Sequence, residues 1–299
     1  MEQKRVVALG FFDGVHLGHG ALLQKCRQVA NDLGATASVI TFEPHPLTLI
    51  TGKPLPLLNT VGDRQYLMQS MYGIDELMLC EFDDHLMKLP WEDFISDYLV
   101  GKFHATAVVC GHDYHFGYKG KGNAENLRET CAKLGLGCYV IDKVEMDSIT
   151  ISSTYIRSQV ACGDMSTAVR FLGHPHLLTG TVVPGRQLGR TMGTPTANLL
   201  LPADLLPPAF GVYATKVTVE SQTYLAVTNV GVRPTVHGEG YITVEPWLLD
   251  FDGDLYGKTL QVELYRHLRP EVKFPSLDAL KTEILGNAQE TRDFFESDL

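Results

Sequence analysis

Near its amino terminus the chain reads VVALGFFDGVHLGHGALLQKCRQVA (residues 6–30), an apolar run followed by a glycine-rich turn. Val6–Leu9 is short and wholly apolar, which predicts a buried strand. Apolar residues then recur at helical spacing, which predicts a helix over Gly20–Asn31. The turn Gly10–His19 therefore joins a strand to a helix, as in the first repeat of an α/β domain.

Two histidines, His16 and His19, stand where this helix is expected to begin. Their i, i+3 spacing places both imidazoles on one helix face. A helix amino terminus presents free backbone N–H groups and a positive dipole end, and both attract phosphate. Imidazoles beside an α-phosphate can donate hydrogen bonds as negative charge develops there. The turn therefore predicts transfer at a nucleotide phosphate; the alternative is a pair of ordinary surface or core histidines.

The composition bounds the class of protein. The chain has 299 residues, enough for two domains, with 44% hydrophobic and 20% charged residues. A formal net charge of −10 argues against a nucleic-acid partner, which favours a basic face. The six cysteines form no Cys-x-x-Cys pair and lie mostly in apolar runs, which predicts reduced thiols in a cytoplasmic protein without structural zinc. No signal peptide or membrane-spanning segment is expected, so no membrane partner is predicted.

The first half of the chain alternates between strand-like and helix-like segments. The expected strands are Val6–Leu9, Ala35–Phe42, Glu76–Cys80, Ala105–Cys110 and Cys138–Ile141. The expected helices are Gly20–Asn31, Gly62–Met71, Glu92–Val100 and Ala124–Leu134. This alternation predicts an α/β, Rossmann-like domain whose parallel sheet has helices on both faces. Ligands of such sheets bind beyond the carboxyl ends of the strands, where the Gly10–His19 turn stands.

Three further stretches at expected strand ends should face the same crevice. Thr41–Pro46 contains two prolines and Phe42, which can lie against a flat ring, although a plain structural turn also fits. Gly111–Gly117 directly follows an expected strand. Ile151–Arg157 places hydroxyls at a helix start and an arginine one turn in, which suits phosphate but also describes an ordinary N-cap.

The pattern changes near residue 174, where strands begin to follow one another without helices between them. The expected strands are Leu178–Val183, Gly211–Glu220, Thr223–Val230, Ile242–Leu249 and Leu260–Tyr265. A helix over Gln159–Leu172 precedes them, and one over Ser276–Phe295 follows. This run predicts a small antiparallel β-barrel with a terminal helix. We therefore expect two domains, residues 1–174 and residues 175–299.

The second domain has its own glycine-rich stretch, GRQLGRTMGTPTANL (residues 185–199). Its glycine, hydroxyl and amide groups suit phosphate oxygens and Mg²⁺, which prefers oxygen ligands. It is not a Walker loop, because Gly-Lys-Ser/Thr is absent. On composition alone a long surface loop fits the stretch as well.

The chain resembles the bacterial family of bifunctional riboflavin kinase/FMN adenylyltransferases, also called FAD synthetases. In the first half the resemblance is carried by FDGVHLGH (residues 12–19), TFEPHP (41–46), GHDYHFG (111–117) and ISSTYIR (151–157). In the second half it is carried by GTPTAN (193–198), NVGVRPT (229–235), LDFDGDLYG (249–257) and LRPEVKF (268–274). His112 and His115 depart from the family pattern, which commonly has an acidic and a basic residue there. The resemblance covers nearly the whole chain.

In the first domain the resemblance implies adenylyl transfer from ATP to FMN. It implies that His16, His19 and Arg157 are catalytic, with the histidines stabilising the reacting phosphate. The implied ATP-binding residues are Gly10, Phe12, Asp13, His16, Gly18, His19, Ser152, Ser153 and Arg157. The implied flavin-binding residues are Phe42, Pro44, Asp113 and Phe116.

In the second domain the resemblance implies phosphoryl transfer from ATP to riboflavin, with Mg²⁺ as cofactor and Glu245 as the base. The implied ATP-binding residues are Gly189, Gly193, Thr196 and Asn198, with Thr196 and Asn198 as metal ligands, and Glu245 and Arg269 are the implied flavin contacts. Because Pro246 cannot donate a hydrogen bond to a neighbouring strand, we expect an edge or a bulge there. The implied small-molecule partners are riboflavin, FMN, FAD and ATP; the pattern specifies no oligomeric state.

Two other functions fit parts of the sequence. A His-x-Gly-His transferase with another acceptor, such as a pantetheine phosphate or nicotinamide mononucleotide, explains the first domain but not the second. A flavin-binding regulatory protein with a decayed kinase is compatible with the departure at Pro246 and Trp247. Turnover of riboflavin and ATP by the purified protein separates all three.

Overall fold

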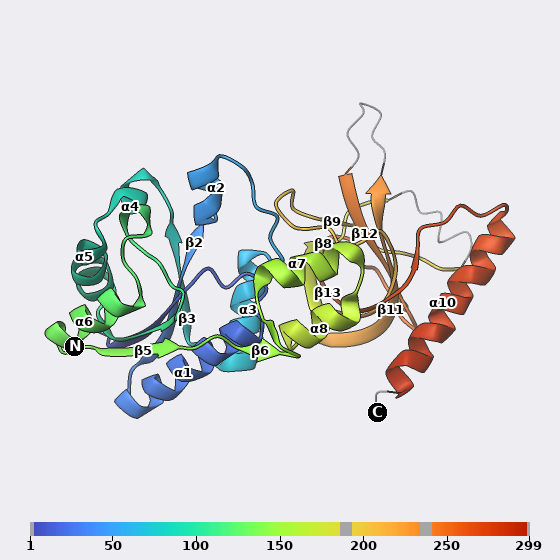
Figure 1. Cartoon of the computed structure of the whole chain (residues 1–299). Coiled ribbons are helices and arrows are strands. Elements are labelled where there is room, and N and C mark those ends of the chain that lie inside the picture. Colours follow the sequence, from blue (N-terminus) through green and yellow to red (C-terminus); the bar gives the residue numbers. More distant parts are fainter. Residues whose placement is uncertain (1–2, 186–192, 234–240, 298–299) are drawn as a thin grey trace. The chain divides into compact units, whose positions relative to one another are not determined.

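The computed structural model of the chain describes residues 3–185, 193–233 and 241–297 (Figure 1). The chain divides into two compact units. The first consists of Met1–Pro56 and Arg64–Ser152, and the second of Leu57–Asp63 and Ser153–Leu299. Each unit contains one large sheet.

The first unit is built on a five-stranded sheet in the order β3-β2-β1-β4-β5, with every neighbouring pair parallel. Its strands are β1 (Arg5–Leu9), β2 (Thr36–Glu43), β3 (Glu76–Glu81), β4 (Ala105–Gly111) and β5 (Gly137–Ile141). After β3 the chain returns to the other side of β1 to form β4. The strand order therefore reverses between β1 and β4, and ligands of such sheets bind at the carboxyl ends of the strands at this point.

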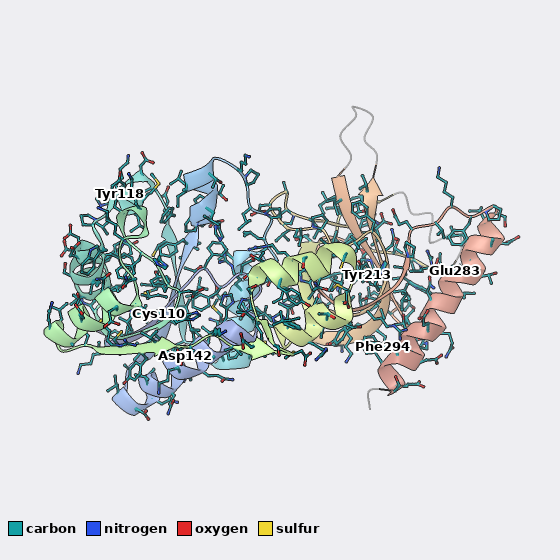
Figure 2. The ribbon with its side chains drawn as sticks, viewed as in Figure 1. Cys110, Tyr118, Asp142, Tyr213, Glu283 and Phe294 are labelled. Carbon is teal, nitrogen blue, oxygen red and sulfur yellow. The ribbon has the colours of Figure 1, made fainter. Side chains whose placement is uncertain are left out.

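Helices cover both faces of this sheet. Helix α1 (Leu17–Leu33) packs on β1, β2 and β4, while Val7 and Leu9 contribute to a core with η1 (Phe94–Lys102) and α6 (Ala124–Leu134). Cys110 lies in this core and is labelled in Figure 2. The remaining elements are α2 (Pro46–Thr51), α3 (Val61–Tyr72), α4 (Asp84–Lys88), α5 (Trp91–Asp93), η2 (Tyr118–Gly120), β6 (Glu145–Met146) and β7 (Ile149–Thr150).

The second unit contains an antiparallel six-stranded sheet in the order β8-β13-β10-β11-β12-β9. Its strands are β8 (His176–Thr181), β9 (Leu199–Leu200), β10 (Gly211–Val219), β11 (Gln222–Arg233), β12 (Tyr241–Leu248) and β13 (Thr259–Pro270). A bridge between Val182 and Leu199 joins the chain after β8 to β9. The two ends of the sheet therefore meet, which closes the barrel and protects its edges.

The helices that lie wholly within the described residues of the second unit are α7 (Ser153–Cys162), α8 (Met165–Leu172) and α10 (Leu277–Ser297). The single helix expected over Gln159–Leu172 is wrong. Gly163 has φ +84°, and Asp164 accepts a hydrogen bond from Thr167 N–H at 3.1 Å as the N-cap of a new helix. The long terminal helix α10 packs on β10 and β11.

The segment Leu57–Asp63 belongs to the second unit, although it lies between two strands of the first sheet in the sequence. The backbone of Leu57 exchanges two hydrogen bonds, each of 2.8 Å, with the loop Asp204–Leu206. Asn59 is fully buried and donates through Nδ2 to the Leu177 carbonyl at 3.1 Å. The first half of the chain therefore contributes a segment that hydrogen-bonds to β8 and to the loop Asp204–Leu206 of the second unit.

The predicted fold class is confirmed. Of the two alternatives expected at Pro246, the bulge is wrong, because the pairing of β12 with β11 shows no register shift. Strand β12 as a whole lies between β11 and β9, but β9 does not extend as far as Pro246, so the strand is an edge at that position. The Pro246 carbonyl accepts a hydrogen bond from Ala197 N–H at 2.9 Å. The backbone beside Pro246 is therefore that of Ala197, which belongs to no strand, since β9 pairs with β12 only at Thr243 and Val244.

Candidate active site

The turn after β1 brings His16 and His19 together as the sequence predicts. His16 is the N-cap of α1, and its Nδ1 accepts a hydrogen bond from the His19 backbone N–H at 3.2 Å. The two rings stack with centroids 3.6 Å apart and planes 12° apart. Because Nδ1 of His16 accepts, the neutral ring carries its proton on Nε2, which leaves that nitrogen as a donor.

The backbone of this turn is strained and held by packing. Phe12 and Val15 have positive φ angles of 61° and 42°, a region that costs non-glycine residues roughly 1–3 kcal/mol each. Both side chains are fully buried, so the core holds them in place. Gly14, with φ +82°, takes the same region without that cost. Such strain at a strand-to-helix turn is typical of functional sites.

Gly18 has a steric role beneath the histidine pair. A Cβ at this position would lie 3.1 Å from two atoms of the His16 ring and 3.4 Å from the Ile151 carbonyl oxygen. A side chain there would displace the imidazole, so glycine allows the stacked arrangement. At Gly10 a Cβ would lie 3.1 Å from the buried Phe12 ring. Asp13, in the same turn, is also buried.

His19 is held in its neutral form. Burial, followed by the nearby His16 and Arg64, lowers the pKa of His19 well below its usual value. Its Nδ1 is buried and has no hydrogen-bond partner among the described residues. A neutral imidazole with a free donor is suited to hydrogen-bonding a phosphate oxygen as charge develops there. Arg64 carries no signal in the sequence that marks it as part of this site.

The predicted flavin contacts of the first domain divide between the core and the surface. Phe42 and Phe116 are buried, and both pack in the core beside η1. Pro44 and Asp113 are exposed on the loops that follow β2 and β4. All four lie at the carboxyl ends of strands of one sheet, which fits the prediction of a shared crevice.

Ser152, Ser153 and Arg157 stand at a helix start, as predicted. Helix α7 begins at Ser153, so Ser152 directly precedes it and Arg157 lies one turn in. The boundary between the compact units falls between Ser152 and Ser153. The histidine pair therefore shares its unit with Ser152, whereas Ser153 and Arg157 belong to the second unit.

The second unit has a pocket that includes two predicted residues, Thr196 and Asn198. Asn198 is 6% exposed, and its Oδ1 has no hydrogen-bond partner among the described residues. Thr196 is exposed. A hydroxyl and a free amide oxygen fit the oxygen ligands that Mg²⁺ takes together with phosphate and water. Within the described ranges no cluster of three His, Cys, Asp or Glu side chains could hold a metal.

The other wall of this pocket comes from a segment that we did not predict as a site. It consists of Leu248 and the turn Phe251–Tyr256 between β12 and β13. The stretch LDFDGDLYG carried a family resemblance, and that was the available signal. Gly193 has φ +77° and is exposed, while Gly189 lies outside the described residues.

Glu245 lies on β12, half-buried and directly opposite Asn229 of β11. Its Oε1 accepts a hydrogen bond from the Thr243 hydroxyl at 3.2 Å. It does not line the pocket that contains Asn198. The carboxylate is thus oriented by a neighbour on its own strand face, as the alternation of β12 predicts.

Arg269 on β13 contacts the terminal helix. Its Nε lies 2.9 Å from Oε1 of Glu283, which Figure 2 labels on α10, and donates to Asn287 Oδ1 at 3.1 Å. Its guanidinium lies 5.4 Å from the centroid of the Phe274 ring. These contacts attach α10 to the barrel, and the flavin contact of Arg269 stays a prediction.

Two family models match the chain one after the other. The FAD synthetase model matches residues 1–155, and the riboflavin kinase model matches residues 172–295. The first match contains the histidine turn, and the second contains the pocket at Thr196 and Asn198. Fold and site together define a two-part transferase that acts on flavins.

Curated relatives match over nearly the whole length. The bifunctional riboflavin kinase/FMN adenylyltransferases of Listeria monocytogenes and Pseudomonas fluorescens are 36% and 37% identical, over 97% and 96% of this chain and 92% of each relative. A crystal structure described as a macrolide-efflux protein from Streptococcus pneumoniae has a TM-score of 0.85 and 32% identity, over 98% of this chain and 95% of that one. This chain belongs to the family of bifunctional riboflavin kinase/FMN adenylyltransferases.

Among the helices of the described ranges, none is both long enough and apolar enough to span a membrane.

Proposed function

We propose that this chain makes FMN and then FAD. The barrel domain, residues 175–299, transfers the γ-phosphoryl group of ATP to the 5′-hydroxyl of riboflavin and releases ADP. The domain of residues 1–174 then lets the FMN phosphate attack the α-phosphate of a second ATP and releases pyrophosphate. The observation that carries the proposal is the succession of both family matches in one chain, with bifunctional relatives along its length.

In the adenylyl transfer, the stacked histidines stabilise the α-phosphate as its negative charge increases. Nε2–H of His16 donates to a phosphate oxygen, and the neutral His19 ring donates beside it. Arg157 and the Ser152 and Ser153 hydroxyls hold phosphate oxygens, and a guanidinium can do so with two parallel hydrogen bonds. The glycine-rich turn provides close backbone approach to the nucleotide.

The flavin in this domain lies between the loops that follow β2 and β4. Phe42 and Phe116 form the apolar floor, and Pro44 and Asp113 form the exposed rim. The support for this placement is that all four residues sit at strand ends on the side of the sheet where the histidine turn also lies.

In the phosphoryl transfer, Thr196 and Asn198 hold the metal-bound nucleotide through oxygen atoms. Mg²⁺ bound by these two residues would neutralise charge on the phosphate oxygens. Glu245 accepts the proton of the riboflavin hydroxyl, and Thr243 fixes the orientation of its carboxylate. Arg269 keeps α10 against the barrel beside the flavin.

The proposal includes a cytoplasmic location, where ATP is available. All six cysteines are free thiols, which fits a reducing compartment. The net charge of −10 argues against nucleic acid as a partner, and it is compatible with small anionic substrates because a site needs only local positive charge.

The test is turnover of riboflavin by the purified chain with ATP and Mg²⁺, followed by chromatography of flavins and nucleotides. We expect FMN to appear first with equal ADP, and FAD to follow with equal pyrophosphate. A second assay starts from FMN and reports the adenylyl transfer alone. FAD from FMN without FMN from riboflavin would identify a decayed kinase, and absence of both products would reject the proposed function.

A further inference from the structure

Arg64 is the largest fully buried side chain of the chain's described part. It is 1% exposed and stands near the start of α3, in the part of that helix that belongs to the first unit. Burial of a guanidinium costs several kcal/mol unless hydrogen bonds and opposite or polar groups compensate. The contacts of Arg64 show which groups compensate this cost.

The guanidinium joins two strand ends. Nη1 of Arg64 donates to the Phe11 carbonyl at 2.6 Å and to the Thr41 hydroxyl at 3.0 Å. The Thr41 hydroxyl itself donates to the Phe11 carbonyl at 2.9 Å, which completes a triangle. Phe11 is the second residue of the turn after β1, and Thr41 lies near the end of β2. Arg64 thus ties the histidine turn to the neighbouring strand.

The ring of Phe11 adds a second attachment. The guanidinium carbon lies 4.3 Å from its centroid, a cation–π contact that gains strength when water is excluded. The centroid of the Phe11 ring also lies 4.1 Å from that of the His45 ring, in the loop after β2. Arg64 therefore contacts both the backbone and the side chain of Phe11, the second residue of the turn.

We propose that Arg64 is a positioning residue for adenylyl transfer: its guanidinium fixes the turn after β1 and thereby the placement of His16 and His19. This inference rests on the proposed function of the first domain. The strained backbone at Phe12 and Val15 needs such support, because several buried contacts must hold a conformation that is unfavourable by itself. A displacement of about 1 Å at a reacting centre can cost roughly 10²-fold in rate.

The charge of Arg64 also acts on His19. The groups that lower the pKa of His19, besides burial, are His16 on its own helix and Arg64 on α3. Removal of the guanidinium charge should therefore raise the pKa of His19. This effect can be measured without turnover. Because burial also lowers the pKa of His19, a loss of packing would raise it too, and Arg64→Lys, which keeps the charge, separates the two causes.

The test compares Arg64→Met, which keeps length and apolar bulk, with Arg64→Lys, which keeps the charge and a donor. Arg128→Met is the matched control, because Arg128 is exposed and pairs only with Glu125 of its own helix among the described contacts. Thr41→Val removes the shared hydroxyl without changing side-chain size, and it carries the test if Arg64→Met does not fold. FAD formation from FMN gives kcat and KM, FMN formation serves as internal standard, and NMR follows the ring signals of the histidines against pH.

We expect Arg64→Met to lower kcat for FAD formation about 10²-fold with little change in KM for ATP, and to leave FMN formation unchanged. Arg64→Lys should recover a large part of the loss, and Thr41→Val should lower kcat less than Arg64→Met. The His19 ring should titrate at a higher pH in Arg64→Met than in the parent. A folded Arg64→Met with the parent kcat and the parent His19 titration would overturn the proposal. If the parent chain makes no FAD, the proposed function fails, and the ring titration still decides whether Arg64 acts on His19.

Discussion

Acidification should destabilise the second unit through His176. This side chain of β8 is fully buried, and neither ring nitrogen has a hydrogen-bond partner among the described residues. Burial, followed by the nearby His174, lowers the pKa of His176 to about 3. An unperturbed histidine titrates near pH 6.5, so at lower pH the unfolded chain binds a proton that the folded chain does not bind. The contribution of His176 to stability is therefore constant above about pH 7 and falls as pH decreases from about 6.5 toward 3.

The size of the effect follows from the linkage of protonation to folding. Each pH unit inside the window costs about 1.4 kcal/mol, so the change from pH 7.5 to pH 5 lowers the free energy of unfolding by about 2 kcal/mol. A substitution His176→Leu removes this contribution because leucine does not titrate. It also removes two buried polar atoms without partners, each of which costs about 1–3 kcal/mol. We expect the variant to be at least as stable as the parent at pH 7.5 and to gain a further 2 kcal/mol or so over it at pH 5.

Urea unfolding measures this difference in a Trp91→Phe background. The chain has two tryptophans, Trp91 in the first unit and Trp247 in the second, so fluorescence then reports the second unit. His85→Leu, at an exposed position of the first unit, is the control and should leave the Trp247 transition unchanged at every pH. A parent-minus-variant difference that does not change between pH 7.5 and pH 5 would refute the reasoning.

Three further predictions concern activity and domain organisation. His16→Ala and His19→Ala should each slow FAD formation from FMN by about 10²–10³-fold while FMN formation persists, because each removes a donor at the reacting phosphate. Chromatography of both products checks this. A variant that forms FAD at the parent rate would show that its histidine does not have the proposed role. Glu245→Gln should abolish most FMN formation but leave FAD formation from supplied FMN, and an unchanged kinase rate would leave Glu245 a structural residue. A chain of residues 175–299 should make FMN but no FAD. Calorimetry should show it melting roughly 5 °C or more below the same unit of the full chain, because it lacks Leu57–Asp63 and the helices α7 and α8, which belong to that unit. Equal melting temperatures would show that these segments add no stability.

The elements predicted correctly are those with a strong local pattern. All five strands of the first sheet were expected within one or two residues, because buried parallel strands are short continuous apolar runs between turn residues. Helix α6 was expected at its observed bounds, Ala124–Leu134. By contrast, α2 and α4 were missed, since helices of six and five residues are too short for apolar periodicity to show. Strand β9, with two residues, is defined by its long-range pairing with β12 and by the bridge of Leu199 to Val182, which no local pattern announces.

Some residues of the candidate site could likewise be predicted from a local pattern, and others could not. The stacking of His16 on His19 follows from their i, i+3 spacing at a helix start, and Gly18 beneath them is part of the same motif. Arg64 was missed because a charged residue on a helix is usually solvent-exposed, and its sequence neighbours give no sign of burial. The turn Phe251–Tyr256 was recognised as a motif but not as a wall of the pocket at Asn198.

The sequence by itself determined the class of both domains, the order of their elements and the residues at the ends of the strands. These properties depend on contacts between near neighbours in the chain, which spacing and residue type encode directly. Only the tertiary structure decided that Leu57–Asp63 belongs with the barrel, that Arg64 lies beneath the histidine turn and that β12 is covered by β9. Each of these depends on which distant segments exclude water from one another, and hydrophobic burial, being non-directional, leaves no local pattern that names the partner.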